Sequence, residues 1–420
     1  MRLLLGLITV ALWADDWPGW RGPTANGIST ETGIPNTWSP TRNIAWKTPL
    51  PGRGRSSPIV WGDRIFLTAE LDGDVIPGAK APIHFLRGEQ FLHPDSQGAD
   101  RSHQLVVLSL DRKTGKILWQ KSAYSGKVFD NRHKAGSYAA PTPLTDGRNI
   151  YAYFGSEGLY AFDYDGKLLW KFDPGPIKTI GMGPGTSPVM DADRVFLQCD
   201  TGEENKSYVV ALDKKTGKTL WRVERPVNLT WSTPLFFDGA LVTAATEKVI
   251  AYDPKTGKQL WEAPGVKGNS VPSPVSGDGV VVVSAGYPEK FASAFGPGGK
   301  PLWSYAKGTA YVPSPIFYGA YVYLITDKGL LTCIDSKTGE VKYEGKRPPV
   351  PATFAGSPVA YDGKILITSE DGDSFVIKAG PEHIVLHSNS IGEPVLSSPA
   401  LSNGMLFLRG KDHLFAIAAQ

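Results

Sequence analysis

The stretch "ALDKKTGKTLW" (residues 211–221) decides the fold, because the chain repeats its pattern. Other copies read "DRKTGKILW" (111–119), "DYDGKLLW" (163–170), "DPKTGKQLW" (253–261), "GPGGKPLW" (296–303) and "DSKTGEVKY" (335–343). A second phrase, Ser or Thr followed by Pro and apolar residues, recurs at Pro58, Pro143, Pro188, Pro234, Pro274, Pro315, Pro358 and Pro399. An all-β unit repeated every ~40 residues is typical of β-propellers with four-stranded blades. Eight copies therefore predict an all-β, eight-bladed propeller.

One unit shows how the strands follow from the residues. "SPVMDADRVFLQCD" (187–200) predicts two strands around a tight turn, and "SYVVALDKKTGKTLWRV" (207–223) predicts two more. The Gly of "TGK" supplies the positive φ that a short hairpin needs. After Pro399 only three strands remain for the last blade, so we expect residues 43–50, "NIAWKTPL", to supply the fourth. Such closure removes the exposed sheet edges that invite aggregation.

A Trp ends most copies of the repeated phrase, on the strand expected to lie outermost in each blade. We expect each indole to dock against the next blade, because a row of exposed indoles would be costly. Burying one removes about 150–250 Å² from water, which is worth up to about 4–6 kcal/mol. The residues interpreted as structural docking residues are Trp46, Trp119, Trp170, Trp221, Trp261 and Trp303.

The composition fits a globular, mostly β chain. Of the 420 residues, 41% are hydrophobic and 20% charged, and 47 Gly and 34 Pro divide the chain into short segments. No window shows a long 3.6-residue apolar period, so we expect little helix. The formal charge of +3 gives no reason to expect a nucleic-acid partner. With only Cys199 and Cys333, a disulfide-built scaffold is excluded.

The N-terminal residues predict export. Residues 1–14 combine an arginine, an apolar run and small residues, which is the pattern of a signal peptide too short to be a membrane anchor. A buried N-terminal strand is the alternative. We expect a periplasmic or extracellular mature chain without a membrane span. Residues 15–42 are expected to pack on the ring as an extension, and residues 43–420 to form the propeller.

The phrase A-x-D-x-x-T-G-K-x-x-W, as in residues 211–221, resembles the repeat of the pyrroloquinoline quinone (PQQ)-type propellers, over residues 43–420. That family includes quinoprotein alcohol and glucose dehydrogenases, and also BamB, a non-enzymatic scaffold of outer-membrane assembly. The segment "DWPGWRGPTANGIS" (16–29) is similar to the N-terminal signature of exported bacterial PQQ-like repeat proteins. The resemblance implies the fold and leaves the activity open, because one fold hosts many functions.

The sequence departs from both well-known branches of that family. Quinoprotein alcohol dehydrogenases typically carry a vicinal Cys pair against the cofactor, whereas Cys199 and Cys333 fall three blades apart. The family's calcium ligands and Asp base match no position, so we assign no catalytic residue. BamB-like proteins carry a lipidated Cys after the signal, and this chain has none there. PQQ with calcium stays a candidate cofactor without assigned residues.

The loops that join consecutive blades are rich in basic residues. Counted from each Trp-equivalent to the next Pro, they hold 15 Lys or Arg and six acidic residues. We call the side on which these loops gather the loop face. A basic funnel there would attract anionic ligands, including the tricarboxylate PQQ, or an acidic partner; the alternative is a solvated rim. The expected binding residues are Arg53, Arg55, Arg132, Lys134, Lys178, Trp231, Asn269, Tyr311 and Arg347.

Two features of the loop face leave alternatives open. Trp231 either stacks on a planar ligand or plugs the channel. Residues 70–104 form the largest departure from the regular blade and predict a lid-like insertion. Histidines cluster in and near it, at His84, His93, His103 and His133, but their spacing matches no ligand motif, so no metal is assigned.

Two functional hypotheses follow from the sequence. The first is a monomeric, non-catalytic binding or scaffold protein that uses the basic loop face for an anionic small molecule or a protein partner. The second is a PQQ-dependent oxidoreductase with an atypical site.

Overall fold

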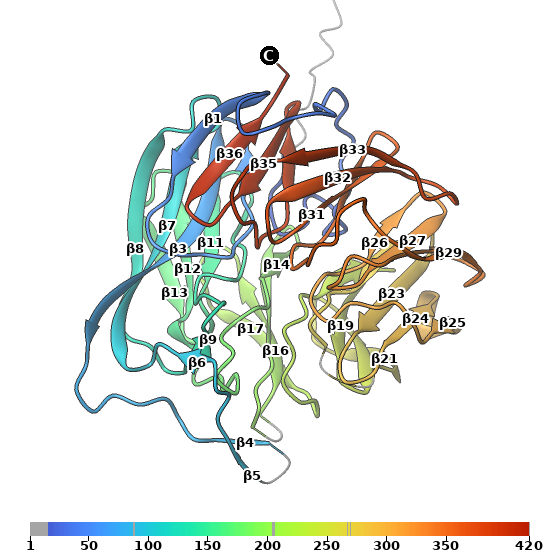
Figure 1. The fold of residues 1–420 in the computed structure, drawn as a ribbon. Coiled ribbons are helices and arrows are strands. Elements are labelled where there is room, and N and C mark those ends of the chain that lie inside the picture. Colours follow the sequence, from blue (N-terminus) through green and yellow to red (C-terminus); the bar gives the residue numbers. More distant parts are fainter. Residues whose placement is uncertain (1–15, 87–88, 204–205, 267, 269, 420) are drawn as a thin grey trace, which may run out of the picture.

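The computed structural model describes residues 16–86, 89–203, 206–266, 268 and 270–419. Eight four-stranded antiparallel sheets succeed one another around a ring in the order of the sequence (Figure 1). The described helices are two single turns, η1 (Gly155–Glu157) and η2 (Pro297–Gly299). The predicted eight-bladed, nearly helix-free propeller is therefore confirmed. The predicted signal, residues 1–14, lies outside the described residues.

Each blade consists of four strands, ordered from the channel outward. Blades 1 to 3 are β2 (Ile59–Trp61), β3 (Arg64–Val75), β7 (Arg101–Asp111), β8 (Ile117–Lys127); β10 (Leu144–Thr145), β11 (Asn149–Tyr153), β12 (Leu159–Asp163), β13 (Leu168–Phe172); and β14 (Val189–Met190), β15 (Arg194–Cys199), β16 (Tyr208–Asp213), β17 (Thr219–Glu224). Blades 4 to 6 are β18 (Leu235–Phe237), β19 (Ala240–Ala245), β20 (Lys248–Tyr252), β21 (Gln259–Pro264); β22 (Val275–Gly277), β23 (Val280–Ala285), β24 (Phe291–Phe295), β25 (Pro301–Tyr305); and β26 (Ile316–Tyr318), β27 (Tyr321–Ile325), β28 (Leu331–Asp335), β29 (Val341–Lys346). Blade 7 is β30 (Val359–Tyr361), β31 (Lys364–Thr368), β32 (Asp373–Lys378) and β33 (Val385–Ser390), and blade 8 is β34 (Ala400–Ser402), β35 (Met405–Arg409), β36 (His413–Ile417) and β1 (Ile44–Pro49).

Blade 8 joins the two ends of the ring. β1 pairs antiparallel with β36, with Trp46 opposite Ala416 and Thr48 opposite Leu414. Figure 1 shows the result as the blue arrow of β1 beside the red arrow of β36. The expected closure of the last blade by the strand within residues 43–50 is confirmed.

Burial within a blade follows from its place between two neighbours. In β19 and β23, with sequences ALVTAA and VVVVSA, every residue is buried. These strands read as continuous apolar runs because both faces of the sheet are covered. The outer strand β17 instead alternates exposed with partly buried residues. Such alternation is expected of a strand with one covered face.

The Ser or Thr of every Ser/Thr-Pro phrase belongs to one closed ring of hydrogen bonds. The backbone N–H of each donates to the side-chain oxygen of its equivalent in the next blade, over 2.8 to 3.1 Å. The members are Ser57, Thr142, Ser187, Thr233, Ser273, Ser314, Ser357 and Ser398, and Ser398 donates back to Ser57. All eight are buried. We call this set the hydroxyl ring.

Each predicted docking Trp covers the turn of the next blade. Nε1 of Trp221 donates to the carbonyl of Pro254 at 3.0 Å, and a Cβ added at Gly257 would lie 2.7 Å from the indole. The same contact joins Trp46 to Gly115, Trp119 to Gly166, Trp170 to Gly217, Trp261 to Gly299 and Trp303 to Gly339. The glycine of the repeated phrase is thus required both for its positive φ and because a side chain would strike the indole.

Residues 16–31 cross the end of the central channel on the face of the tight turns, which we call the turn face. The carbonyl of Pro18 accepts a hydrogen bond from the N–H of Thr145 in blade 2 at 2.8 Å. Nη2 of Arg21 donates at 2.7 Å to the carbonyl of Pro315 in blade 6, on the opposite side of the ring. Further hydrogen bonds join Asn26 to Ser276, Gly27 and Ser29 to Ala360, and Glu31 to Asn403 and Gly404. The segment therefore spans the ring.

The insertion within residues 70–104 is fastened to the loop between blades 1 and 2. It carries the hairpin β4 (His84–Leu86) and β5 (Glu89–Phe91), which Figure 1 shows projecting away from blade 1. Its strand β6 (Ser96–Gln97) pairs with β9 (Arg132–His133) of that loop. The buried His84 and Asp130 also approach to 2.8 Å. Two separate contacts thus hold the insertion on the loop face.

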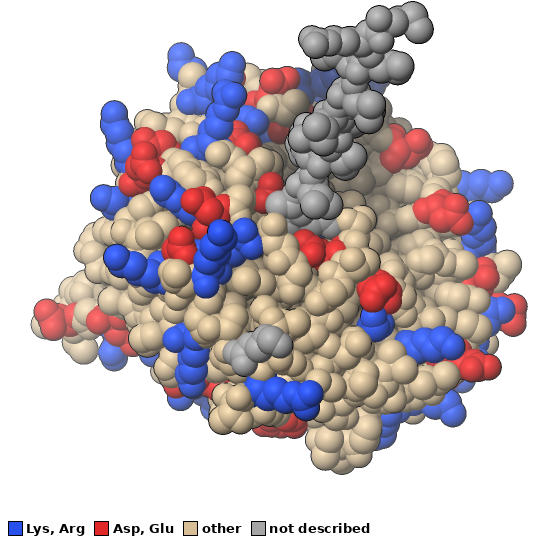
Figure 2. Space-filling model, turned by 90° about the horizontal axis from the view of Figure 1, so that it is seen from above, with Lys and Arg blue, Asp and Glu red and all other residues tan. Residues whose placement is uncertain are grey.

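The outer surface carries charges of both signs. Figure 2 looks from above onto the side where β1, β36 and β33 lie, and basic and acidic side chains are interspersed there. This side has no large patch of one sign. Within the described ranges, no helix has the length and apolar character needed to cross a membrane.

Candidate functional site

A cavity of about 620 Å³ on the loop face, between blades 8 and 1, is the candidate site. Its size falls within the range of small-molecule sites, roughly 300–1,000 Å³. Its charged lining consists of five basic and three acidic residues: Arg53, Arg55, Lys134, Arg409, Lys411, Glu70, Asp72 and Asp412. We call it the arginine cavity.

Arg409, Arg55 and the exposed Lys411 are the cations of this cavity that form no ion pair among the described residues, and the two arginines are the less exposed of them. Arg409 ends β35 and is only 3% exposed; its Nη1 donates to the carbonyl and Oγ of Ser56 at 3.0 and 2.6 Å, and its Nε has no partner. Among the described residues, neither guanidinium has a carboxylate oxygen within 4.0 Å. Burial lowers the pKa of Arg409 to about 9 and that of Arg55 to about 10. Glu370 acts on Arg55 electrostatically but forms no ion pair with it. The buried Arg409 and the partly exposed Arg55 therefore favour a bound anion.

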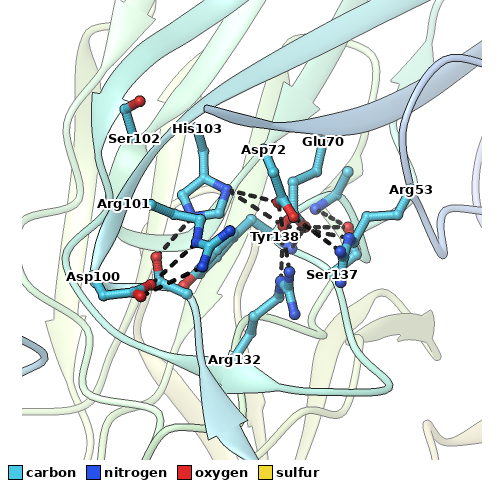
Figure 3. Close-up of polar contacts among 12 residues, drawn as sticks. Arg53, Glu70, Asp72, Asp100, Arg101, Ser102, His103, Arg132, Ser137 and Tyr138 are labelled. Carbon is cyan, nitrogen blue, oxygen red and sulfur yellow. Dashed lines mark hydrogen bonds and ion pairs between the residues drawn. The ribbon is translucent and has the colours of Figure 1, made fainter. Parts of the chain in front are cut away.

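Glu70, by contrast, is a carboxylate in the cavity wall whose two oxygens both accept hydrogen bonds (Figure 3). Its Oε1 accepts from Nε of Arg132 at 2.8 Å, and its Oε2 accepts from Oγ of Ser137 at 2.7 Å and the N–H of Tyr138 at 2.8 Å. Burial alone would raise the pKa of Glu70, but His103, Arg132 and Ser137 together lower it to about 2. Glu70 therefore organises the loop of blade 2 and is not free to bind a ligand.

The imidazole of His103 faces these carboxylates (Figure 3). Its Nε2 lies 2.7 Å from the carbonyl of Gly98, which can only accept, so Nε2 carries a proton. Its Nδ1 faces Glu70 at 3.4 Å and Asp72 at 3.3 Å. Burial alone would lower the pKa of His103, but these partners raise it. Asp72 also accepts from Nη2 of Arg53 at 2.9 Å, so both acids are matched by cations.

The structure brings four of the nine expected binding residues together. Arg53, Arg55 and Lys134 line the arginine cavity, and the buried Arg132 contacts it through Glu70. Of these, Arg55 is the one without an ion pair among the described residues.

The other predicted residues lie elsewhere. Lys178 pairs with Glu203 at 2.8 Å, and Arg347 is exposed in the loop after blade 6. Tyr311 lies in the loop before blade 6, where its backbone N–H is held by a carboxylate. Asn269 lies outside the described residues. Lys178, Tyr311 and Arg347 therefore form no common site with the arginine cavity.

Trp231 packs into the glycine-rich loop "GMGPGTSP" (181–188) of blade 3. Its Nε1 donates to the carbonyl of Gly183 at 2.9 Å, and a Cβ added at Gly185 would lie 2.8 Å from the indole. The space beside it measures about 30 Å³, enough for a water molecule and too small for a planar ligand. This packing favours the plugging role of Trp231 over a stacking role.

Counting charges along the inter-blade segments overestimated the basic character of the loop face. Six of the counted residues belong to outermost strands: Lys47, Lys121, Lys127, Lys171, Arg222 and Lys346. Others are paired with acids outside those loops, such as Lys134 with Asp95 at 2.9 Å. Of the counted residues that lie in the loops themselves, Arg53, Arg55 and Lys134 line the arginine cavity.

Two groups of side chains among the described residues have the composition of a metal site: His93, Asp95 and His133, and Glu70, Asp72 and His103. In the second group, the carboxylates of Glu70 and Asp72 already accept hydrogen bonds from arginine side chains. In the first, Nδ1 of each imidazole accepts a backbone N–H at 3.2 Å, which leaves the ring proton on Nε2. Metal-bound imidazoles instead donate from the nitrogen opposite the metal. Hydrogen bonding therefore explains both groups better than a metal ion.

The arginine cavity fits one part of the cofactor implied by the resemblance. The carboxylates of PQQ would find unpaired cations in Arg55 and Arg409, in a cavity of sufficient volume. Calcium requires several free carboxylate or carbonyl oxygens. Glu70 and Asp72 do not supply them, because arginine and histidine side chains already occupy their oxygens. Asp412 remains as a single exposed carboxylate without an ion pair among the described residues. The residues therefore fit a polycarboxylate better than calcium.

Sequence reasoning missed Arg409 and Lys411, because only the loops between blades were counted. A usable signal existed in the repeat. Arg409 ends the second strand of blade 8, where the other seven blades carry the uncharged Thr68, Tyr153, Gln198, Ala244, Ser284, Ile325 and Thr368. A charge at this single position marks blade 8 as different.

The eight blades and their repeated docking phrase are those of a propeller of the PQQ type. The sequence profile of the family described as "Outer membrane protein assembly factor BamB" matches residues 102–344 and 245–380. The chain belongs to this family. It is also 23% identical, over 269 residues, to a polyvinylalcohol dehydrogenase from Pseudomonas sp. That alignment covers 49% of this chain and 40% of the relative, so the chain matches less than half of the relative's length.

Solved structures of similar fold include a BamB and a dehydrogenase. BamB from Moraxella catarrhalis matches with a TM-score of 0.57 and 13% identity, over 83% of this chain and 99% of that one. A europium-containing methanol dehydrogenase matches with a TM-score of 0.64 and 13% identity, over 94% and 89%. At such identities the likeness shows the shared fold alone.

Proposed function

We propose that this chain is an exported, non-catalytic binding protein whose arginine cavity holds a ligand with several carboxylates. The observation that carries the proposal is a pair of guanidinium groups, those of the buried Arg409 and the partly exposed Arg55, that form no ion pair among the described residues. Carboxylate recognition suits arginine, because its planar fork donates in parallel to both oxygens. The ligand is either a small polycarboxylate or the acidic segment of a protein partner, and we expect the chain itself to be a monomer.

A PQQ-dependent oxidoreductase is the second candidate function. PQQ is a tricarboxylate, and the similarity to a polyvinylalcohol dehydrogenase favours this candidate. PQQ would supply the redox chemistry, while Arg55 and Arg409 would bind and orient its carboxylates. The pairing of Glu70 and Asp72 with cations argues against calcium in the same cavity.

The proposal is tested by comparing two matched arginine variants. Arg55→Gln removes a cavity charge, whereas Arg347→Gln removes an exposed charge elsewhere on the loop face. Citrate and PQQ serve as probes in a calorimetric titration. Loss of a buried, charge-assisted hydrogen bond costs about 1.5–3 kcal/mol, so we expect Arg55→Gln to weaken binding about tenfold or more. Equal affinities in the two variants would show that the arginine cavity does not bind these probes.

A further inference from the structure

Arg21 is a second buried arginine without a counter-ion, and it lies on the opposite face from the arginine cavity. It sits in the segment 16–31 that spans the turn face and is only 1% exposed. Its Nη2 donates to the carbonyl of Pro315 at 2.7 Å, while Nε and Nη1 have no hydrogen-bond partner among the described residues. Its Cζ lies 5.7 Å from the centre of the Trp20 ring, a cation–π contact that carries no counter-charge. Within the described ranges no carboxylate oxygen lies within 4.0 Å of it. Burial lowers the pKa of Arg21 to about 9.

The surroundings of Arg21 offer further hydrogen-bond donors. Pro315 directly follows Ser314, so the guanidinium lies next to the hydroxyl ring. Each hydroxyl of that ring accepts a backbone N–H, and none of the eight donates its own hydrogen to an acceptor among the described residues. The ring hydroxyls therefore keep hydrogens that they can still donate.

The space around Arg21 is too tight for a large ligand. A Cβ added at Gly27 would come within 3.0 Å of Nη2 of Arg21 and 2.9 Å of the carbonyl of Pro358. The segment that carries Arg21 is also held by hydrogen bonds to blades on opposite sides of the ring. An occupant must therefore be small.

We propose that Arg21 and the adjacent hydroxyl ring form a binding site for a small inorganic anion such as chloride, separate from the arginine cavity. A buried guanidinium is strongly disfavoured unless it is paired and hydrogen-bonded. The unpartnered Nε and Nη1 supply the charge-assisted bonds, and the ring hydroxyls contribute directly or through water. The anion would fix the N-terminal segment across the turn face and so stabilise the closed ring.

The test measures thermal stability in sodium chloride, sodium bromide and sodium gluconate at equal ionic strength. Chloride and bromide should raise the Tm of the wild type by about 3 °C over gluconate, with saturation. Arg21→Met, which keeps a long apolar side chain, should lose this difference. Arg148→Met, at an exposed arginine of the turn face, and Arg55→Gln should keep it. Identical Tm values in all three salts, or an unchanged effect in Arg21→Met, would overturn the proposal and leave water as the occupant.

A second measurement covers the case in which Arg21→Met does not fold. Chlorine-35 NMR of the wild type should show line broadening that bromide competes away, and bromide-soaked crystals should show anomalous scattering at Arg21. Scattering elsewhere only, with none at Arg21, would contradict the site independently of any variant.

Discussion

The backbone N–H of Ser398 donates a hydrogen bond of 3.1 Å to Oγ of Ser57, a residue 341 positions earlier in the chain. This contact completes the hydroxyl ring and therefore closes the propeller at its innermost strands. The pairing of β1 with β36 closes it within blade 8. Closure thus rests on two separate sets of hydrogen bonds, one around the channel and one within a sheet.

Thr233→Val tests whether the hydroxyl ring contributes to stability. Oγ1 of Thr233 accepts the N–H of Ser187 at 2.9 Å, and valine would leave that buried N–H without a partner. An unsatisfied buried donor costs about 1–3 kcal/mol. We expect Thr233→Val to lower the free energy of unfolding by this amount, measured by urea denaturation. Thr233→Ser keeps the hydroxyl and is the control; equal losses in the two variants would show that the hydroxyl is unimportant.

Trp221→Ala tests the contact between blades 3 and 4. The variant removes the hydrogen bond to the carbonyl of Pro254 and uncovers Gly257. Replacing a packed Trp by Ala costs roughly 3–5 kcal/mol. A loss below about 1 kcal/mol in the same denaturation assay would mean that the indole is not docked.

Gly257→Ala probes the same contact from the opposite side. Its φ is +73°, and the new Cβ would come within 2.7 Å of the indole of Trp221. We expect a loss of stability of more than about 1 kcal/mol, because strain at positive φ and the steric clash act together. Gly279, at φ +75° with open space around it, is the control: Gly279→Ala experiences only the backbone strain. Equal losses at the two positions would exclude a contribution from the indole.

Glu157 gives the protein a defined dependence on pH. Burial raises the pKa of its carboxyl from 4.5 to about 7, although Oε1 accepts the N–H of Phe129 at 2.8 Å. Between these two values the unfolded chain is ionised while the folded protein keeps the proton. Stability should therefore be greatest below pH 4.5 for this group and fall as pH rises to about 7, by at most about 1.4 kcal/mol per pH unit.

Glu157→Gln should remove this dependence, since the amide keeps the acceptor for Phe129 and cannot ionise. Denaturation at pH 5 and pH 8 should show a smaller difference for the variant than for the wild type, with the variant more stable at pH 8. A wild type and variant with the same pH profile would mean that Glu157 titrates normally in the folded protein.

The fold could be predicted from the sequence because each blade repeats the same local requirements. The glycine of "TGK", the Trp that follows it and the Ser/Thr before Pro recur at nearly constant spacing, and each makes the same contact in successive blades. Glycine was expected only for its backbone conformation. Its packing against the indole of the preceding blade could not be predicted, because it depends on the rotation between sheets.

The candidate site could be predicted only in part, because it is formed where the repeat is broken. Arg53 and Arg55 stand in an inter-blade loop that pattern analysis could examine. Arg409 stands at the end of a strand, and the partners of Glu70 come from a loop more than sixty residues away. Whether a basic residue is neutralised depends on such contacts, which spacing along the chain does not indicate.

The most direct test of the central claim is a calorimetric titration of the mature wild-type protein with PQQ, with and without calcium. The arginine cavity predicts saturable binding near or below micromolar that needs no calcium and weakens as salt rises, because its unpaired cations outnumber the one carboxylate without an ion pair among the described residues, Asp412. Dye reduction in the same samples would then decide between a binding protein and an oxidoreductase. No heat of binding under either condition, for PQQ or citrate, or binding that requires calcium would contradict the account.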